Sequence, residues 1–112
     1  MHEFSIVQSI VEIALDSARA HNVVRISAVE VEVGMASGVM REAMEFAWEA
    51  AKKGTILEDA LLNIKLIPIK AVCRKCRTIY QSGEFFDPCP ECGDFNPEII
   101  EGKELRVVAI ET

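Results

Sequence analysis

The sequence predicts an α+β fold, in which two helices pack on one face of a three-stranded sheet and a small cysteine module is inserted between the last two strands. Three observations lead to this prediction. Two stretches carry apolar residues at helical spacing, three others alternate between apolar and polar residues, and one segment, residues 70–102, holds all four cysteines. At 112 residues the chain is long enough for one small domain, or for one domain with an appended module.

The first helix is predicted to begin near Ser5 and to end near Ala20. "SIVQ", residues 5–8, has the form of a capping box, which places residues 1–4 ahead of the helix. Asn22 suits the left-handed position that follows a helix. The apolar residues recur every three to four positions and so predict one buried face, made by Phe4, Val7, Val11, Ala14 and Ala18.

The second helix is predicted over residues 39–53, with Gly54 closing it. We expect Trp48 to pack at the interface between helix and sheet. Met40 and Met44, four positions apart, are interpreted as packing residues of the core or of a partner contact. The spacing predicts a buried face formed by Ala43, Phe46, Ala47 and Ala50.

Three segments alternate with a period of two, as strands with one buried and one wet face do. They are "RISAVEVEVG" at residues 25–34, "ALLNIKLIP" at residues 60–68, and Leu105–Ile110 near the C-terminus. In the first segment the core positions are Val29, Val31 and Val33. In the second they are Leu62, Ile64 and Leu66.

Residues 70–102 differ from the rest in holding three of the four prolines and few aliphatic residues. We therefore expect residues 1–69 and 103–112 to form the α/β domain and residues 70–102 to form a separate module. The cysteines follow the pattern C-x₂-C-x₁₂-C-x₂-C, the spacing of a closed Cys₄ zinc site. The predicted zinc ligands are Cys73, Cys76, Cys89 and Cys92.

Zn²⁺ is the favoured metal because the site is closed and all-sulfur, although iron in a rubredoxin-like site fits the same tetrahedron. Disulfide exchange fits two facing cysteine pairs less well than coordination does. With no coordination position left open, the zinc is predicted to be structural rather than catalytic. Gly93 can take a positive φ after the second pair, whereas Arg77 at the matching place leaves the geometry of the first turn open.

Composition and charge exclude several classes of function. The net charge of −6 argues against a nucleic-acid partner, and a Zn(Cys)₄ centre would add further negative charge. The sequence has no apolar run long enough to cross a bilayer and no signal-peptide pattern at its start, so we expect a cytoplasmic protein with reduced cysteines and no membrane partner. It has no nucleophile set, phosphate-binding glycine loop or carboxylate pair, so we do not expect an enzyme.

The chain begins Met-His, and such a start can chelate a metal. The α-amine of Met1, the backbone nitrogen of His2 and its imidazole Nδ1 can hold one ion in two fused rings. Ni²⁺ and Cu²⁺ favour this flat set of nitrogen donors, and Zn²⁺ gains less from it. Taken alone, a Met-His start is more often a solvated chain end. His21, the other histidine, is expected to lie exposed at the end of the first helix.

"MHEFSIVQSIV" at the start, the "VEVG" strand followed by a small-residue loop, and "C-x₂-C…CPEC" resemble the HypA/HybF family. The resemblance covers essentially the whole chain. It implies a metallochaperone for [NiFe] hydrogenase maturation, with a nickel-binding α/β domain and a zinc domain. It also implies that transiently bound Ni²⁺ is delivered together with a HypB-type GTPase to the hydrogenase large subunit.

The resemblance further implies which residues bind nickel: the Met1 amine and His2, with Glu3 contributing through its backbone or carboxylate. Two departures leave the fourth nickel ligand open. Met40 stands where some members have an acidic residue, and the zinc module lacks the extra histidine of some members. A run of glutamates on the second helix is interpreted as a solvated face, with a GTPase contact as the alternative: Glu42, Glu45 and Glu49.

Three hypotheses follow. The first is a nickel carrier, monomeric or weakly self-associating, whose recipient is hydrogenase, with urease left open as a second recipient. The second is a zinc-ribbon interaction module in which the Met-His start is incidental. The third is an electron-transfer protein with iron in the Cys₄ site, which would be coloured when purified.

Overall fold

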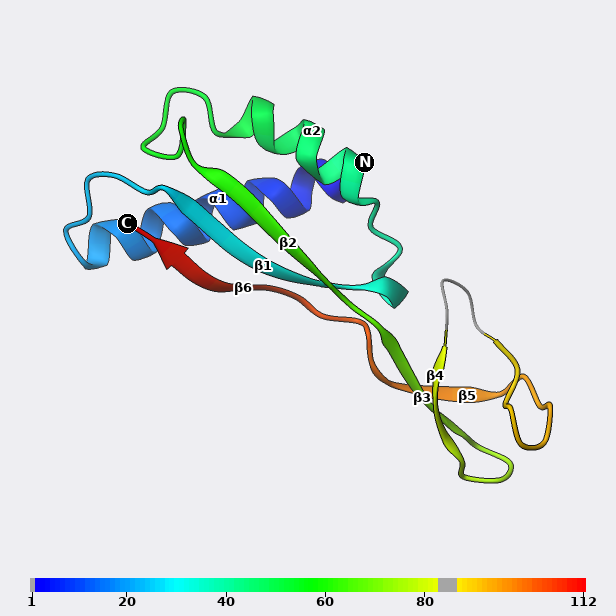
Figure 1. Ribbon diagram of the computed structural model, residues 1–112. Coiled ribbons are helices and arrows are strands. Elements are labelled where there is room, and N and C mark those ends of the chain that lie inside the picture. The colour runs from blue at the N-terminus through cyan, green and yellow to red at the C-terminus, as the bar shows by residue number, and fades with distance from the viewer. Residues whose placement is uncertain (1, 83–86) are drawn as a thin grey trace. The chain divides into compact units, whose positions relative to one another are not determined.

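The computed structural model describes residues 2–82 and 87–112, with His2 described by its backbone alone. The chain forms two compact units, each built from segments distant in sequence (Figure 1). The unit with both helices, named here the helical unit, comprises Met1–Glu32, Val39–Lys65 and Arg106–Thr112. The unit with the cysteines, named the cysteine unit, comprises Val33–Gly38 and Leu66–Leu105.

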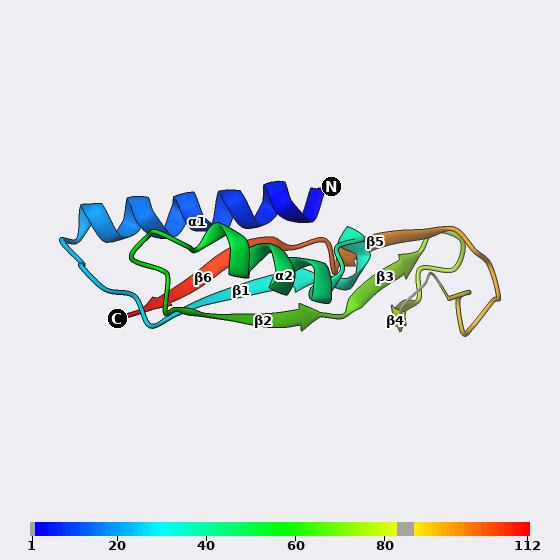
Figure 2. The ribbon, with the colours of Figure 1, turned by 90° about the horizontal axis from the view of Figure 1, so that it is seen from above.

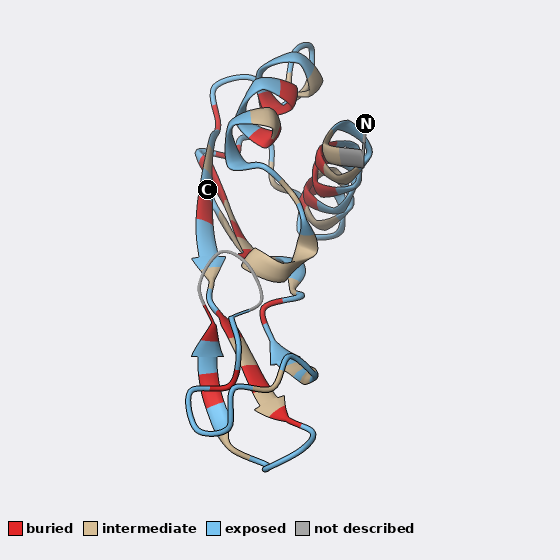
Figure 3. Cartoon of the chain, turned by 90° about the vertical axis from the view of Figure 1, so that its right-hand side faces the viewer, coloured by how far each residue is buried: buried red, intermediate tan, exposed pale blue. Residues whose placement is uncertain are grey.

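The helical unit is built from two helices and a mixed three-stranded sheet of order β2-β1-β6. Its elements are α1 (His2–Ala20), β1 (Ala28–Gly34), α2 (Arg41–Ala51), β2 (Leu61–Ile67) and β6 (Leu105–Glu111). Both helices lie over the same face of the sheet (Figure 3). The predicted α+β class, with two helices on one face of a three-stranded sheet, is confirmed. Neither of these helices is long and apolar enough to span a bilayer.

The sheet is mixed because β2 runs parallel to β1 while β6 runs antiparallel to it. The Leu61 N–H at the start of β2 donates to the Ser27 carbonyl just ahead of β1 (3.0 Å), and Figure 1 shows the two strands running in the same direction. The Ser27 N–H donates to the Glu111 carbonyl at the end of β6 (2.8 Å). α2 thus provides the crossover that a parallel strand pair needs.

α1 buries most of the predicted apolar stripe, namely Val7, Val11, Ala14 and Ala18. The predicted start near Ser5 is wrong, because the helix begins at His2. Ser5 lies inside the helix, where its carbonyl accepts a hydrogen bond from the Ser9 hydroxyl (3.2 Å). Glu3 in the first turn complements the positive end of the helix dipole. Phe4 is 40% exposed rather than buried.

β1 is the central strand, and its three core positions are buried as predicted: Val29, Val31 and Val33. On the other face Arg106 of β6 donates to the Glu32 carboxylate (2.6 Å). In β2, Ile64 is buried as predicted, but Leu66 is 41% exposed. Leu66 lies past Lys65, the last β2 residue of the helical unit, and therefore outside the core that the helices cover.

α2 presents a different face to the core from the one predicted. Its buried residues are Met44, Ala47 and Trp48. Phe46 is 82% exposed and Ala50 is exposed as well, so their predicted burial is wrong. The helix carries two overlapping apolar stripes, and Trp48 selects between them. Its indole Nε1 donates to the Ala60 carbonyl (3.1 Å) in a buried position, which satisfies the N–H.

The cysteine unit has its own three-stranded antiparallel sheet of order β4-β3-β5, which the sequence did not predict. Its strands are β3 (Ile69–Cys73), β4 (Ile79–Ser82) and β5 (Pro97–Glu101). They are short, and the β3–β5 register shifts between Lys70 and Ala71, so no long alternating pattern reveals them. One buried cluster of this unit comprises Ala71, Cys73, Tyr80 and Cys89, with Ile99 packed against them, and Ile69 of β3 is buried as well.

The backbones of two segments of the cysteine unit approach each other closely at Gly34 and Gly102. The short 3₁₀ helix η1 (Met35–Ser37) follows Gly34, whose N–H donates to the Glu104 carbonyl (2.6 Å). The Ala36 N–H donates to the Gly102 carbonyl (2.7 Å). A Cβ atom on Gly34 would overlap the Gly102 carbonyl group, so this close backbone approach requires glycine.

We expect Phe46→Ala to change the free energy of unfolding by less than about 0.5 kcal/mol, because truncating an exposed side chain removes little packing. Met44→Ala removes a fully buried side chain from the same helix and should cost about 2–5 kcal/mol. Urea unfolding followed by Trp48 fluorescence measures both. Equal losses in the two variants would contradict the orientation of α2.

Candidate metal centre

The first cysteine pair lies on a tight turn that begins at the end of β3. The Arg77 N–H donates to the Cys73 carbonyl (2.8 Å), and the Cys73 N–H donates to the Thr78 carbonyl (2.9 Å). The turn closes because Arg77 adopts φ +67°, a left-handed conformation that is unfavourable for a residue with a Cβ. The sequence left the geometry of this first cysteine turn open, and the structure shows a closed turn.

The second cysteine pair repeats this backbone pattern residue for residue. The Gly93 N–H donates to the Cys89 carbonyl (2.8 Å), and the Cys89 N–H donates to the Asp94 carbonyl (2.9 Å). Gly93 has φ +75°, which confirms its predicted role. Arg77 and Gly93 thus occupy equivalent places, each directly after the second cysteine of its pair.

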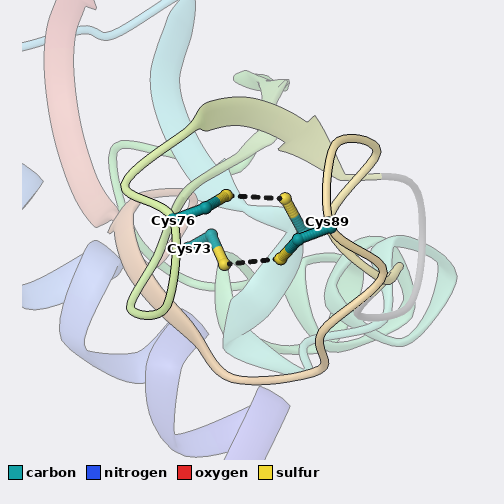
Figure 4. Close-up of side chains that lie close together, drawn as sticks. Cys73, Cys76 and Cys89 are labelled. Atoms are coloured by element: carbon teal, nitrogen blue, oxygen red, sulfur yellow. Dashed lines mark hydrogen bonds between the residues drawn. The ribbon is translucent and has the colours of Figure 1, made fainter.

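The two turns bring all four sulfurs together, with each Sγ within 4.8 Å of the others. The Sγ atoms of Cys73 and Cys92 are 3.6 Å apart and those of Cys76 and Cys89 are 3.5 Å apart (Figure 4). Four sulfurs at about 2.3 Å from a central Zn²⁺ would be roughly 3.8 Å apart. A disulfide needs about 2.05 Å, so the geometry fits a tetrahedral metal ion and not two disulfides.

The surroundings of the sulfurs suit a structural metal. Cys73 and Cys89 are buried, at 1% and 2% exposure, while Cys76 and Cys92 lie at the surface. Four cysteine ligands would fill the four coordination positions of a tetrahedral metal ion, which would leave no place for a substrate or a catalytic water. The residues that the spacing predicted as ligands are therefore brought together by the fold.

Hydrogen bonding and desolvation together give two of the thiols very different pKa values. The Thr78 hydroxyl, 3.2 Å from the Cys76 sulfur, and the Thr78 backbone N–H lower the pKa of Cys76 to about 6. The Asp94 backbone N–H favours the thiolate of Cys92, but burial and the neighbouring thiols outweigh it and raise the pKa of Cys92 to about 12. Near neutral pH Cys76 is thus largely a thiolate, while Cys92 keeps its proton until a cation replaces it.

Met1 and the side chain of His2, two of the predicted nickel ligands, lie outside the described residues. Glu3, the third, is half-buried. Its Oε2 accepts a hydrogen bond from the Met40 N–H (3.3 Å) at the residue that precedes α2. The structure therefore links Glu3 to Met40, the position at which some members of the family that the chain resembles have an acidic residue.

His21 lies near the end of α1, away from the first turn of that helix. It is exposed, and its Nδ1 lies 2.9 Å from the Ser17 carbonyl. The predicted helix end is confirmed nearby, since Asn22 has φ +54° and the Val23 N–H donates to the Ala18 carbonyl (2.9 Å). His21 is thus an exposed residue at a helix C-terminus, as predicted.

Comparison with known proteins identifies the family. All residues, 1–112, match the family described as HypA, hydrogenase/urease nickel incorporation metallochaperone. The chain belongs to the HypA family. It is 44% identical to the hydrogenase maturation factor HypA of Geobacter sulfurreducens over 111 residues, which cover 99% of this chain and 98% of that protein. The HypA of Parabacteroides distasonis is 40% identical over 110 residues, with coverages of 98% and 96%.

Solved HypA structures share the fold. The solution structure of the Ni metallochaperone HypA from Helicobacter pylori has a TM-score of 0.68, covers 97% of this chain and 95% of that one, and is 23% identical, so the likeness concerns the fold alone. Another solution structure of a HypA protein has a TM-score of 0.71 at 25% identity, with coverages of 99% and 95%.

Membership of the HypA family confirms the resemblance found in the sequence and places the chain in a family of metallochaperones rather than enzymes. Two features of the site were beyond sequence reasoning. The contact between Glu3 and Met40 joins residues 37 positions apart in the sequence, and no local pattern encodes it. The left-handed conformation of Arg77 could have been suspected only because Arg77 follows the second cysteine of its pair, as Gly93 does in the other pair.

Arg77→Gly should raise the free energy of unfolding of the metal-bound protein by up to about 1.5 kcal/mol. Relief of left-handed strain, about 1–2 kcal/mol, exceeds the extra chain entropy of a glycine, about 0.5–1 kcal/mol. Gly93→Ala, at the equivalent place, should lower it. Calorimetric melting of both variants is the measurement, and a shift of the same sign in the two would argue against equivalent turns.

The affinity for Zn²⁺ should fall on acidification, and more steeply below about pH 6. Above that value Cys76 is already a thiolate. Below it, metal binding must displace one more proton, which lowers the affinity by a further factor of about ten per pH unit. Competition with a chromophoric chelator between about pH 5 and 8 gives the slope. Thr78→Val removes the hydroxyl that lowers the pKa of Cys76 and should move the break to higher pH. An unmoved break would exclude Cys76 as its cause.

Proposed function

We propose that this chain is a nickel metallochaperone that binds Ni²⁺ at its N-terminus and delivers it for maturation of [NiFe] hydrogenase. Nickel is the cargo, held by Met1, His2 and Glu3. We assign nickel binding to the α/β domain of residues 1–69 and 103–112, and zinc binding to the module of residues 70–102. Membership of the HypA family over the full chain is the observation that carries this proposal.

The start of α1 at His2 supports a nitrogen-donor site there. The first N–H groups of an α-helix have no acceptor within the helix, so the His2 backbone nitrogen is not committed to the helical hydrogen-bond pattern. Ni²⁺ can displace the proton of this nitrogen once the amine and the imidazole anchor the ion. The positive end of the helix dipole then favours the negative charge that develops on the amide.

Glu3 gives the proposed site a fixed carboxylate. Its hydrogen bond from the Met40 N–H restrains the side chain beside the start of α2. A restrained ligand loses less conformational entropy when an ion binds. Glu3 is therefore our candidate for an additional oxygen ligand, with its backbone as the other option.

We assign Zn²⁺ to Cys73, Cys76, Cys89 and Cys92, in a structural role. The convergence of four sulfurs, two of them on buried cysteines, supports a metal that stays bound. When bound, Zn²⁺ cross-links the two cysteine turns and neutralises part of the thiolate charge. The sequence charge of −6 fits a protein partner better than a nucleic acid.

The partners follow from the family function. We propose a HypB-type GTPase as the protein that acts with this chain and the large subunit of [NiFe] hydrogenase as the recipient. Four unpaired cysteines in a metal-binding arrangement support a cytoplasmic location, where thiols stay reduced. The chain would act there as a monomer or a weak homo-oligomer.

Calorimetric titration of the untagged protein with Ni²⁺ tests the proposal. We expect one tight equivalent, its loss in His2→Ala, and its loss again when one residue is added ahead of Met1, since the extension moves the amine away. Glu3→Gln keeps an oxygen for the Met40 N–H but loses the negative charge, so weaker nickel binding would identify the carboxylate as a ligand. Equal binding by the native and extended proteins would refute the amine site and favour a zinc-ribbon interaction module.

A further inference from the structure

The cysteines differ in exposure in the same way in both turns of the cysteine unit. Cys73 and Cys89, the first of each pair, are buried, whereas Cys76 and Cys92, the second of each pair, are exposed. The buried cysteines belong to the cluster around Tyr80. A small solute that arrives from the solvent therefore reaches the second cysteine of each turn before the first.

The short sulfur contacts cross from one turn to the other, and each joins an exposed cysteine to a buried one (Figure 4). The Sγ atoms of Cys76 and Cys89 are 3.5 Å apart, and those of Cys92 and Cys73 are 3.6 Å apart. Each exposed sulfur thus has a buried sulfur of the opposite turn beside it. A disulfide needs about 2.05 Å, so each pair has to approach by roughly 1.5 Å before it can bond.

This arrangement suits a reaction with a two-electron oxidant of the hydroperoxide class. A thiolate sulfur attacks one oxygen of hydrogen peroxide, the O–O bond breaks, and hydroxide leaves, which gives a sulfenic acid. A neighbouring thiolate then attacks the oxidised sulfur, so that a sulfur–sulfur bond forms, the S–O bond breaks and a second hydroxide leaves. Each sulfur has lost one electron and the peroxide has gained two. Both hydroxides take up protons from the solvent and become water.

We propose that the Cys₄ site is a reversible peroxide-sensitive switch, in which Cys76 pairs with Cys89 and Cys92 pairs with Cys73 while the metal is released. Cys76 and Cys92 are the sites of modification, and the buried cysteines resolve their sulfenic acids. The thiolate is the form of cysteine that binds a metal, so each disulfide removes two ligands. The switch rests on the proposed zinc site and is independent of nickel binding.

Pairing across the turns decides what happens to the fold when the metal leaves. Disulfides within each turn would leave the two turns unconnected, whereas disulfides across the turns keep them joined. The segment between Cys73 and Cys92 contains the whole of β4, so this bond closes a long loop and constrains the unfolded chain. A covalent cross-link thus replaces the cross-link made by the metal, and reduction by a thiol restores the ligands.

A neighbouring thiolate also protects the exposed sulfurs from irreversible damage. A sulfenic acid that meets more peroxide is oxidised to sulfinic and sulfonic acid, which thiols do not reduce. The buried sulfurs, at 3.5 and 3.6 Å, compete with that reaction from within the protein. In a reducing compartment the site therefore stays loaded with metal until peroxide appears.

The test treats the zinc-loaded full chain with excess hydrogen peroxide and follows zinc release with a chromophoric chelator. We expect the chain to release all of its zinc, and to bind zinc again after dithiothreitol and Zn²⁺ are added. Trp48 is buried in α2, which packs beside α1 (Figure 2), so its fluorescence reports on the helical unit. This fluorescence should not change when zinc leaves.

Peptide mapping identifies the disulfides. Trypsin cleaves after Arg74 and Lys75, between the cysteines of the first pair, and after Arg77, which separates the two pairs. A glutamate-specific protease cleaves after Glu91, between the cysteines of the second pair. Each cysteine therefore lies on its own peptide, and mass spectrometry distinguishes all pairings. Both disulfides should join an exposed cysteine to a buried one of the other turn.

A matched pair of variants tests which sulfurs react with peroxide. In Cys89→Ser the sulfenic acid of Cys76 has lost its neighbouring thiolate, so dimedone, which traps sulfenic acids, should label Cys76 more than Cys92. In Cys73→Ser this preference should reverse. Loss of zinc from a variant does not affect the mapping of the unchanged chain, which tests the pairing by itself.

Three outcomes would overturn the switch. The zinc-loaded chain could retain its zinc in excess peroxide. The disulfides could lie within each turn. Zinc could leave with formation of sulfinic and sulfonic acids that dithiothreitol does not reverse. A purified chain that holds no zinc before oxidation would refute the zinc assignment together with the switch, whereas zinc that is present and retained would refute the switch alone.

Discussion

The convergence of four cysteine sulfurs is the constraint on which the cysteine unit depends. All four lie within 4.8 Å of one another, and four thiolates at that spacing repel each other strongly unless a cation lies between them. Two of the cysteines belong to a buried cluster around Ala71, Tyr80 and Ile99. A metal ion that joins the four sulfurs would supplement the apolar packing of this small unit.

The helical unit has no such need. Its core contains buried side chains from both helices and from β1, including Val7, Val31, Met44 and Trp48. An apolar core of this kind holds α1 in place whether or not an ion is bound. The first turn of α1 can therefore exchange a ligand without unfolding the unit, which is what a carrier of a transient cargo requires. The two units thus differ in their source of stability as well as in the metals proposed for them.

The sequence predicted those features of the structure that a single strand or turn encodes and failed where distant contacts decide. The buried valines of β1 and the four converging cysteines follow from periodicity and spacing, because each pattern reports on a single strand or turn. The face that α2 buries was mispredicted, because two apolar stripes share the helix and only the distant Ala60 carbonyl, which pairs with Trp48, selects one. The β4-β3-β5 sheet was missed because its strands are short and interrupted by a bulge.

Donor chemistry explains why one chain would keep two metal sites apart. Four thiolates around one ion retain a metal, because its release requires protons to replace it at the sulfurs. An amine and an imidazole take up protons on mild acidification and so lose a bound cation readily. In the proposed nickel site these donors belong to a chain end, and Glu3 is the ligand restrained by a second element, through Met40. Retention and release therefore depend on different donors, and the cargo can leave without disturbing the metal that stabilises the fold.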